Sequence, residues 1–314
     1  MEPSQTLSSL TSRCVLSLDR YFDANPTRLV LVQGDTTTAF AAGLVAFYHK
    51  AKVGHVEAGL RTMNKYSPWP EEMNRRLVTQ LSDFHFAPTP RSVQFLQNEG
   101  VLQESILLSG NTVIDALEYT IAKVRKTGVH PESLREFFEG NRKSDRIVLI
   151  TGHRRENFGE GFVSICRAIK SLAGRYSNCT FIYPVHLNPN VRKPVFGLLG
   201  NTPNIRLIEP LEYPEFVSLM DRSFMILTDS GGIQEEAPSL HKPVIVFREN
   251  TERPEAVNAG LAVIAGTTEE RIIGEFVSII DDSSKYAAMS GGKNPYGDGT
   301  SAKRIVEFLS RRIR

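Results

Sequence analysis

Residues 28–38 read RLVLVQGDTTT, and this stretch contains the unit from which the rest of the fold can be inferred. A short apolar run over residues 28–32 leads into Gly34 and Asp35, and a stretch of helical length follows over residues 36–49. The apolar positions are continuous rather than alternating, which is typical of a strand covered on both faces in a parallel sheet. The pattern therefore predicts a strand–turn–helix unit of an α/β protein.

The same unit recurs along the chain. Amphipathic stretches of helical length occupy residues 71–81, 161–175 and 213–220, and a helical stretch over residues 7–22 precedes the first strand. This alternation predicts βαβ units and a doubly wound α/β fold. The nine further predicted strands occupy residues 53–56, 85–87, 106–109, 146–150, 180–184, 205–208, 224–227, 244–247 and 262–265.

The length and one break in the pattern predict two domains. A domain usually has about 150 residues, so a chain of 314 residues fits two of them. Gly110 and Asn111 interrupt the pattern after a predicted strand, which places the boundary there. We therefore predict a first domain over residues 1–110 and a second over residues 111–300. The last residues, 301–314, have a helical pattern.

The composition argues against several classes of protein. Lys and Arg total 37 and Asp and Glu total 35, and a net charge of +2 gives no reason to expect binding to nucleic acid or to a membrane surface. Three widely spaced cysteines, Cys14, Cys166 and Cys179, form neither a disulfide framework nor a CxxC metal pair. No apolar run approaches the roughly 18 residues of a transmembrane helix, and the chain start lacks a secretory signal pattern. These observations predict a cytoplasmic protein.

Two carboxylates follow predicted strands in the first domain. Asp35 follows the first strand, and Glu57 follows the second in GHVEAGLRT, residues 54–62. Open α/β sheets bind their ligands at the carboxyl ends of strands, so both positions suit a site. The alternative for the first is that Asp35 or Thr36 only caps the following helix.

A third carboxylate lies in SPWPEEMNR, residues 67–75, where Glu71 opens a helix. Glu71, Asn74 and Arg75 are spaced to lie on one helix face. Glu71 and Glu72 also favour the helix dipole, which is the alternative account of both residues. Three converging carboxylates would supply the tuned base that a proton abstraction needs.

Two histidines follow predicted strands in the second domain. His153 lies in TGHRREN, residues 151–157, beside Arg154 and Arg155, whose guanidinium groups suit phosphate recognition. His186 follows a later strand. A lone histidine is more often structural, and neither histidine has the spacing of a metal-binding motif, so we predict no metal site.

The strongest local signal is LTDSGGIQEEA, residues 227–237. A strand leads through Ser230 and Gly231 into a helix, whose first amide groups and dipole can bind phosphate. Glu236 lies further along this helix and could accept hydrogen bonds from ribose hydroxyls, and Arg253 is a further loop cation. The spacing matches neither GxGxxG nor the P-loop, and the alternative is a helix cap followed by acidic residues.

Together these segments resemble the non-hydrolysing UDP-N-acetylglucosamine 2-epimerases of bacterial type. Each segment alone is unspecific, but their combination, in the family's order over nearly the whole chain, is highly specific. The matching segments are GDTTT (34–38), GHVEAGLRT (54–62), SPWPEEMNR (67–75), GNTVIDAL (110–117), TGHRREN (151–157), YPVHLNPNV (183–191), LTDSGGIQEEAPSL (227–240), ERPEAV (252–257) and NPYGDG (294–299).

The resemblance implies two Rossmann-like domains of the glycosyltransferase-B type, with the active site in the cleft between them and helix 301–314 completing the first domain. It implies an isomerase that interconverts UDP-N-acetylglucosamine and UDP-N-acetylmannosamine for cell-surface polysaccharide synthesis. In that reaction the C2 proton is removed and UDP is expelled from C1, which gives a 2-acetamidoglucal to which UDP adds back. Neither a metal nor NAD takes part, and a homodimer is expected.

The resemblance also assigns roles to single residues. The positions that match the family's catalytic groups are Asp35, Glu57, Glu71 and His153. The positions that match its UDP contacts are Phe216, on the uracil side, and Ser230, Gly231, Glu236 and Arg253. Arg154 and His186 match positions that hold a second, regulatory UDP-N-acetylglucosamine in some members.

One part of the family pattern is absent. Members begin with a strand and a Gly-Thr-Arg-Pro-Glu turn, whose Arg and a following Lys reach the nucleotide phosphates, whereas residues 1–10 already match a later point. We therefore expect a truncated first domain whose sheet exposes an edge or apolar faces. Two rivals to the epimerase are a glycosyltransferase that uses a UDP-sugar and an inactive UDP-sugar-binding remnant. A hydrolysing epimerase that releases UDP is a near neighbour.

Overall fold

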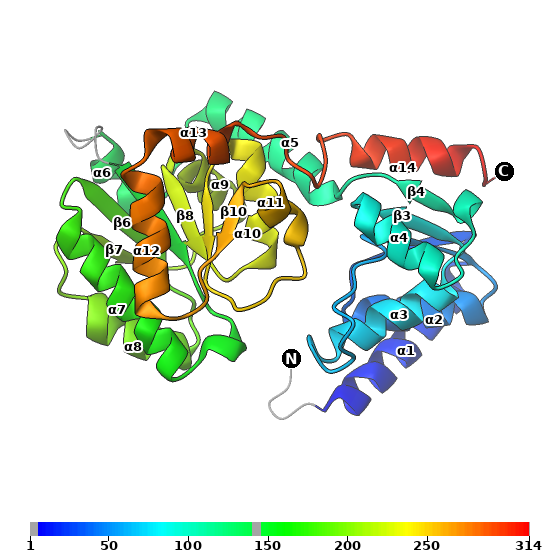
Figure 1. The fold of residues 1–314 in the computed structure, drawn as a ribbon. Coiled ribbons are helices and arrows are strands. Elements are labelled where there is room, and N and C mark those ends of the chain that lie inside the picture. Colours follow the sequence, from blue (N-terminus) through cyan, green and yellow to red (C-terminus); the bar gives the residue numbers. More distant parts are fainter. Residues whose placement is uncertain (1–5, 140–145, 314) are drawn as a thin grey trace. The chain divides into compact units, whose positions relative to one another are not determined.

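The computed structural model describes residues 6–139 and 146–313, and the chain falls into two compact units (Figure 1). Unit 1 comprises Met1–Asp115 and Tyr296–Arg314, and unit 2 comprises Ala116–Pro295. Residues 1–5, 140–145 and 314, which fall within the predicted domains and the predicted last helix, lie outside the described residues.

Unit 1 is built on a four-stranded parallel sheet in the order β1-β2-β3-β4. Its strands are β1 (Leu29–Gln33), β2 (Lys52–Val56), β3 (Phe84–Ala87) and β4 (Ile106–Leu108). Its helices are α1 (Leu7–Ala24), α2 (Thr37–Tyr48), α3 (Glu71–Leu81), α4 (Pro90–Asn98), the start of α5 (Thr112–Thr127) and α14 (Ser301–Ser310).

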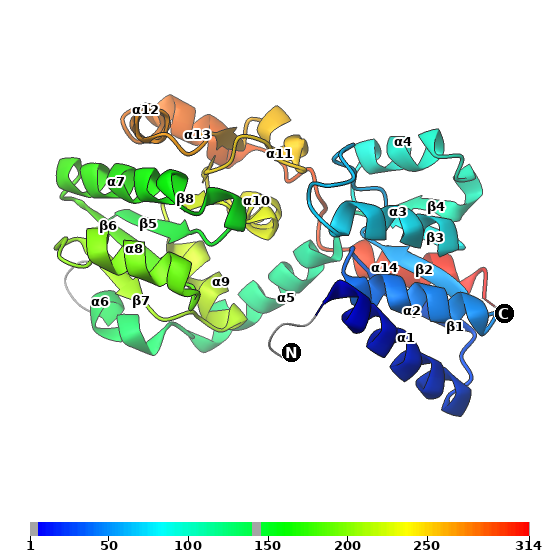
Figure 2. The same ribbon diagram turned by 90° about the horizontal axis from the view of Figure 1, so that it is seen from below.

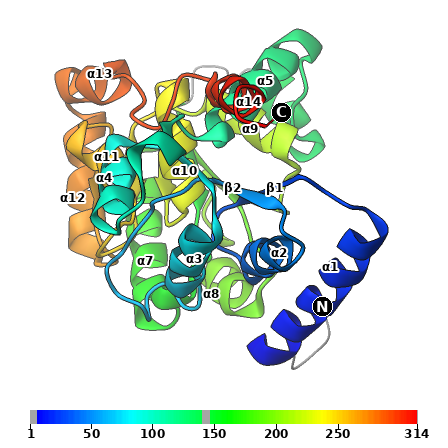
Figure 3. The same ribbon diagram turned by 90° about the vertical axis from the view of Figure 1, so that its right-hand side faces the viewer.

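The helices of unit 1 cover both faces of this sheet. Figure 1 shows α14 on one face and α1, α2 and α3 on the other, and Figure 3 shows these three helices side by side. On the α14 face, Ile305 and Leu309 pack against Val56, Phe84 and Phe86. This burial explains why the strands read as continuous apolar runs.

Strand β1 is one of the two edge strands of this sheet in the described part of the chain. Val32 is the only buried residue of this strand, and Leu31 is 50% exposed. An open parallel edge with an exposed leucine is unusual, because such edges are normally covered.

Unit 2 is built on a six-stranded parallel sheet in the order β10-β9-β8-β5-β6-β7. Its strands are β5 (Arg146–Thr151), β6 (Cys179–Pro184), β7 (Ile205–Ile208), β8 (Met225–Thr228), β9 (Val244–Val246) and β10 (Ala262–Ile264). Its helices, besides most of α5, are α6 (Arg135–Glu139), α7 (Glu160–Arg175), α8 (Pro189–Leu199), α9 (Tyr213–Arg222), α10 (Gly231–Glu236), α11 (Pro254–Asn258), α12 (Glu269–Ile280) and α13 (Ser283–Gly291).

The strand order of unit 2 reverses between β5 and β8. The chain passes from β5 outward to β6 and β7, and then returns to β8 and continues outward through β9 and β10. Open α/β sheets bind ligands at the carboxyl ends of the strands at such a reversal. The loops that follow β5 and β8 are therefore the expected place for a ligand in this unit.

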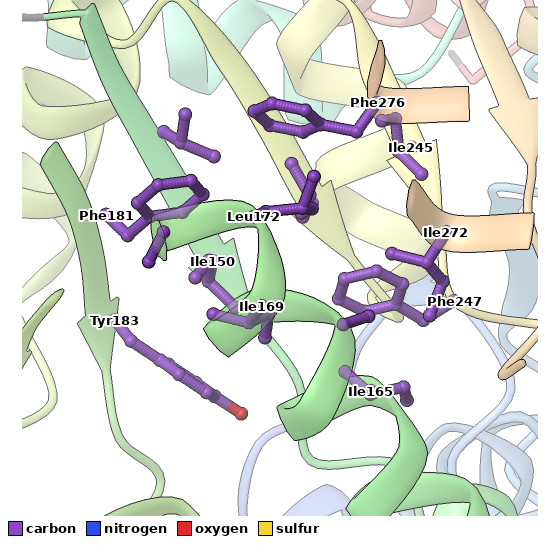
Figure 4. Packing of buried hydrophobic residues seen from close by; sticks show 14 of the residues in the cluster. Ile150, Ile165, Ile169, Leu172, Phe181, Tyr183, Ile245, Phe247, Ile272 and Phe276 are labelled. Atoms are coloured by element: carbon purple, nitrogen blue, oxygen red, sulfur yellow. The ribbon is translucent and has the colours of Figure 1, made fainter. Parts of the chain in front are cut away.

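The core of unit 2 lies between the sheet and helices α7 and α12. Figure 2 shows α7 lying between α12 and α8. Ile165, Ile169 and Leu172 line the inner face of α7, and the rings of Phe181 and Phe276 stack with centroids 5.9 Å apart (Figure 4). This packing fixes the carboxyl ends of β5 and β8 rigidly.

The ten strands predicted from the sequence are all present, with ends that move by no more than one residue. The polar stretch after residue 123 contains more helix than its composition suggests, because α5 runs on to Thr127 and α6 follows. Among the described residues, no helix is both long enough and apolar enough to cross a membrane.

Candidate active site

The turn after β1 presents Asp35 rather than using it as a helix cap. The cap of α2 is Thr36, whose hydroxyl oxygen accepts a hydrogen bond from the Ala39 amide at 3.1 Å. The Asp35 carboxylate instead forms an ion pair with Arg75, and the Asp35 backbone carbonyl accepts a hydrogen bond from Asn74 Nδ2 at 2.9 Å. Asp35 is therefore held by α3, the helix that begins at Glu71.

Glu57 lies against the same turn. It follows β2 in a left-handed backbone conformation with φ of 67°, which is rare for a residue with a side chain and often marks a functional site. A Cβ atom on Gly34 would lie 3.5 Å from Glu57 Oε2. The carboxylate of Glu57 thus borders the turn that carries Asp35, and the φ of 69° at Gly34 is one that glycine adopts without strain.

Glu71 is the first residue of α3 and is half-buried. It shares one helix face with Asn74 and Arg75, both of which contact Asp35. Unit 1 thus places Glu57 beside the turn that carries Asp35, and Glu71 on the helix face whose Asn74 and Arg75 contact Asp35.

Glu72 is a functional candidate that sequence reasoning missed. Its carboxylate is fully buried and accepts hydrogen bonds from the Thr62 amide at 3.0 Å, Arg76 Nε at 3.0 Å and Arg75 Nη1 at 3.4 Å. The sequence suggested only a favourable interaction with the helix dipole. The spacing of Glu72 from Arg75 and Arg76, three and four residues later, was the signal that could have revealed the network.

The loop after β5 in unit 2 is organised by Asp229. This residue is fully buried at the end of β8, and its Oδ2 accepts hydrogen bonds from the amides of His153 and Arg154, both at 2.9 Å, and from Asn157 Nδ2 at 3.2 Å. The sequence placed Asp229 only within a possible cap. Its role as an anchor was hidden because its partners lie more than 70 residues away.

His153 and His186 face each other across this loop. Their rings stack with centroids 5.0 Å apart and an angle of 11° between the planes. The pKa of His153 is lowered, first because the surrounding protein displaces water and then because His186 and Arg154 lie nearby, while Asp229 acts in the opposite direction. His153 is therefore held mostly neutral at pH 7, as a polar group that can donate or accept a hydrogen bond.

A cavity of about 210 Å³ opens beside the two histidines. It lies at the reversal of the strand order, where the loops after β5 and β8 meet. Its lining residues are Thr151, Gly152, His153, Pro184, His186, Pro210, Leu211, Phe216, Ser230 and Ile233. The structure therefore brings together four residues that the sequence assigned separately, namely His153, His186, Phe216 and Ser230.

Arg253 lies against the start of α10. A Cβ atom on Gly231 would overlap its guanidinium group, so the side chain of Arg253 packs directly on the backbone of Gly231. Arg253 Nε donates to Glu235 Oε1 at 2.6 Å and Nη1 donates to Glu252 Oε1 at 2.5 Å. Arg154 reaches the same Glu252 oxygen at 3.7 Å, which brings two predicted ligand-binding cations to one carboxylate.

The start of α10 combines amide groups with a buried acid. Ser230 occupies the cap position, but its side chain makes no capping hydrogen bond. Glu236 is buried and receives a long hydrogen bond of 3.4 Å from the Tyr213 hydroxyl. Burial and the neighbouring Glu235 raise the pKa of Glu236 to about 7, although the Tyr213 hydroxyl acts to lower it.

No group of three or more His, Cys, Asp or Glu side chains suited to hold a metal ion occurs in the part of the chain that the structure describes. The candidate residues instead form two sets. Unit 1 carries carboxylates held by a buried arginine, and unit 2 carries a cavity with histidines, a glycine turn and a protonatable glutamate.

Comparisons with known proteins agree on one family. The family model for UDP-N-acetylglucosamine 2-epimerase matches residues 1–310. A probable UDP-N-acetylglucosamine 2-epimerase of Ralstonia nicotianae is 50% identical over 312 residues, which cover 98% of this chain and 82% of the relative. The UDP-N-acetylglucosamine 2-epimerase of Escherichia coli is 48% identical over 309 residues, with the same two coverages.

The fold agrees as well. A crystal structure of the UDP-GlcNAc 2-epimerase from Neisseria meningitidis, bound to UDP-GlcNAc, matches with a TM-score of 0.93 and 48% identity, and covers 99% of this chain and 84% of that one. The predicted α/β fold class and the predicted resemblance are thereby confirmed. Because the family model and the relatives match almost its whole length, the chain belongs to the UDP-N-acetylglucosamine 2-epimerase family.

Proposed function

We propose that this chain interconverts UDP-N-acetylglucosamine and UDP-N-acetylmannosamine by elimination and re-addition of UDP. One observation carries the proposal for the chemical step: Asp35 and Glu57, at the ends of neighbouring parallel strands, both border the Gly34 turn. Epimerisation at C2 needs acid–base groups for two faces of one carbon, and a pair of positioned carboxylates supplies them.

The elimination balances without any further reactant. A carboxylate takes the C2 proton, the electrons of the C–H bond form the C1–C2 double bond, and the C1–O bond breaks with its electrons leaving on UDP. Re-addition reverses these changes, with the proton delivered to the opposite face of C2. The steps involve no net oxidation or reduction, so the proposal invokes no redox cofactor.

We assign the proton transfers to Asp35, Glu57 and Glu71. Arg75 is paired with Asp35 and is itself buried, so the ion pair holds this carboxylate in place beside α3. We assign His153 to a polar contact with the reacting sugar or its leaving group, because its lowered pKa keeps the ring neutral.

We assign UDP binding to unit 2. The amides at the start of α10, with Ser230, Gly231 and Arg253, suit the diphosphate. Glu236 suits the ribose hydroxyls, and Phe216 lines the cavity where we place the uracil. Arg154 and His186 are proposed to contact a second, regulatory UDP-N-acetylglucosamine. A cytoplasmic homodimer that supplies polysaccharide synthesis completes the proposal.

The test is proton NMR of the chain with UDP-N-acetylglucosamine in D₂O. We expect the C2 proton signal to disappear while the signals of UDP-N-acetylmannosamine grow, because the proton added back comes from solvent. Release of UDP without the mannosamine nucleotide would indicate a hydrolysing enzyme instead. Turnover only with an added acceptor sugar would indicate a glycosyltransferase, and ligand binding without any exchange would indicate an inactive remnant.

The proposed contact between Glu236 and the ribose predicts that the binding of UDP depends on pH. Ribose hydroxyls donate hydrogen bonds to ionised Glu236, and a carboxyl group with a pKa of about 7 is roughly one-tenth ionised at pH 6 and nine-tenths at pH 8. We therefore expect UDP to bind about tenfold more tightly at pH 8 than at pH 6, as measured by titration calorimetry. The Glu236→Gln variant should lose this dependence, and the comparison removes the titration of UDP itself. Equal slopes in both proteins would contradict the assignment.

A further inference from the structure

Two buried histidines in unit 1 have no part in the mechanism above. His55 lies in β2 and His85 lies in β3, and the two residues are direct partners in the parallel register. His55 is fully buried and His85 is 3% exposed. Burying a polar side chain costs free energy unless the side chain forms hydrogen bonds. The hydrogen-bond partner of each histidine therefore shows which part of the structure that histidine holds.

His55 holds the turn between the two carboxylates. Its Nε2 lies 2.9 Å from the backbone carbonyl oxygen of Gly34. A carbonyl oxygen can only accept a hydrogen bond, so Nε2 carries the proton and donates it. The Gly34 amide donates in turn to the Val56 carbonyl at 3.0 Å. The Gly34 residue is thus fixed to β2 through both of its polar backbone groups.

His55 is suited to hold a position and not to transfer a proton. Burial, with further contributions from His85, Arg61 and Arg75, lowers its pKa to about 3, although the hydrogen bond to Gly34 acts to raise it. Its Nδ1 has no hydrogen-bond partner among the described residues. The ring is therefore a permanently neutral donor with a single bond, and that bond ends on the turn that carries Asp35.

We propose that His55 is a positioning residue that sets the placement of Asp35 relative to Glu57. Asp35 directly follows the carbonyl that His55 holds, and Glu57 follows His55 by two residues, immediately after the end of β2. Loss of this hydrogen bond would change the position of the Asp35 carboxylate relative to that of Glu57. The inference rests on the proposed function, which assigns the proton transfers to these two residues.

His85 provides a matched control. It has the same residue type, nearly the same burial and the neighbouring register position, and its Nε2 lies 3.1 Å from the Thr79 carbonyl within α3. Its pKa is also lowered, first by burial. Thr79 does not belong to the turn at Gly34, so replacing His85 removes a comparable buried hydrogen bond while the turn keeps its own.

The experiment compares His55→Leu, His55→Gln and His85→Leu. For His55→Leu we expect kcat to fall on the order of 100-fold with KM and UDP affinity changed by less than about twofold, because a small displacement of a reacting group slows chemistry more than binding. His55→Gln keeps an amide donor and should recover part of the rate. His85→Leu should lower the melting temperature similarly and leave kcat within about twofold.

Hydrogen–deuterium exchange gives a readout that does not depend on activity. The amides of Gly34 and Asp35 should exchange faster in His55→Leu than in His85→Leu. Equal loss of kcat in the two leucine variants, no recovery by glutamine, or unchanged exchange at the turn would each overturn the proposal. If Asp35→Asn and Glu57→Gln retained full activity, the proposed function would fail instead, while the exchange measurement would still decide whether His55 holds the turn.

Discussion

Replacing Asp35 by Asn is expected to lower kcat by about three orders of magnitude, while the dissociation constant for UDP stays within about twofold. The side chain keeps its size, so the turn and the helix cap at Thr36 remain, but the group can no longer accept a proton. Glu57→Gln should behave in the same way. Steady-state kinetics and UDP titration calorimetry measure the two effects separately.

Asp83 and Glu236 supply the controls for this experiment. Asp83 Oδ2 accepts a hydrogen bond from the Val53 amide at 2.8 Å, so Asp83→Asn changes a carboxylate in the same unit while keeping the acceptor oxygen. We expect it to leave kcat unchanged. Glu236→Ala should mainly weaken UDP binding. If all the variants lost rate and affinity equally, the carboxylates would only support the fold.

Replacing Arg75 by Met is expected to destabilise unit 1 by about 3 kcal/mol and to lower kcat as well. The guanidinium group of Arg75 is buried and contacts both Asp35 and the fully buried Glu72. Without it, Glu72 retains Arg76 and the Thr62 amide as its partners among the residues that the structure describes. Urea unfolding followed by circular dichroism measures the change in stability.

A double variant separates stability from chemistry in this network. Adding Glu72→Gln to Arg75→Met removes the charge of a fully buried carboxylate that has lost one of its two arginine partners, so part of the lost stability should return. The rate should stay low, because Asp35 still lacks its partner. If the double variant were no more stable than Arg75→Met, buried charge would not be the cause of the destabilisation.

The strands, and the carboxylates that directly follow them, could be located from the sequence because their signals are local. A continuous apolar run of about five residues is enough to identify a buried parallel strand. A carboxylate that follows such a run is recognised from the same short segment of sequence. The α2 cap shows the limit of this approach: Asp35 and Thr36 are equally good caps by residue type. Only the observed Thr36–Ala39 hydrogen bond and the Asp35–Arg75 ion pair distinguish them.

The residues that sequence reasoning missed act through partners that are distant along the chain. Asp229 binds the loop at His153, and His55 binds Gly34 from the next strand. Periodicity contains no information on such pairs, because the contacts arise only when strands become neighbours. The helix α5 was obscured differently: its buried positions Ile114, Leu117, Ile121 and Val124 follow helical spacing but lie among polar residues.

Unit 1 depends on a segment that leaves the ribosome after every other element described here. Helix α14 supplies Ile305 and Leu309 to the core, and the Phe308 ring lies edge-on to Phe84 and Phe86 at 5.9 and 5.8 Å. Unit 2 is continuous and can bury its core while α14 is still being synthesised. Unit 2 can therefore complete its core before unit 1 does, and the nascent first sheet keeps an apolar face open to chaperones, or to other nascent chains, until α14 has been synthesised.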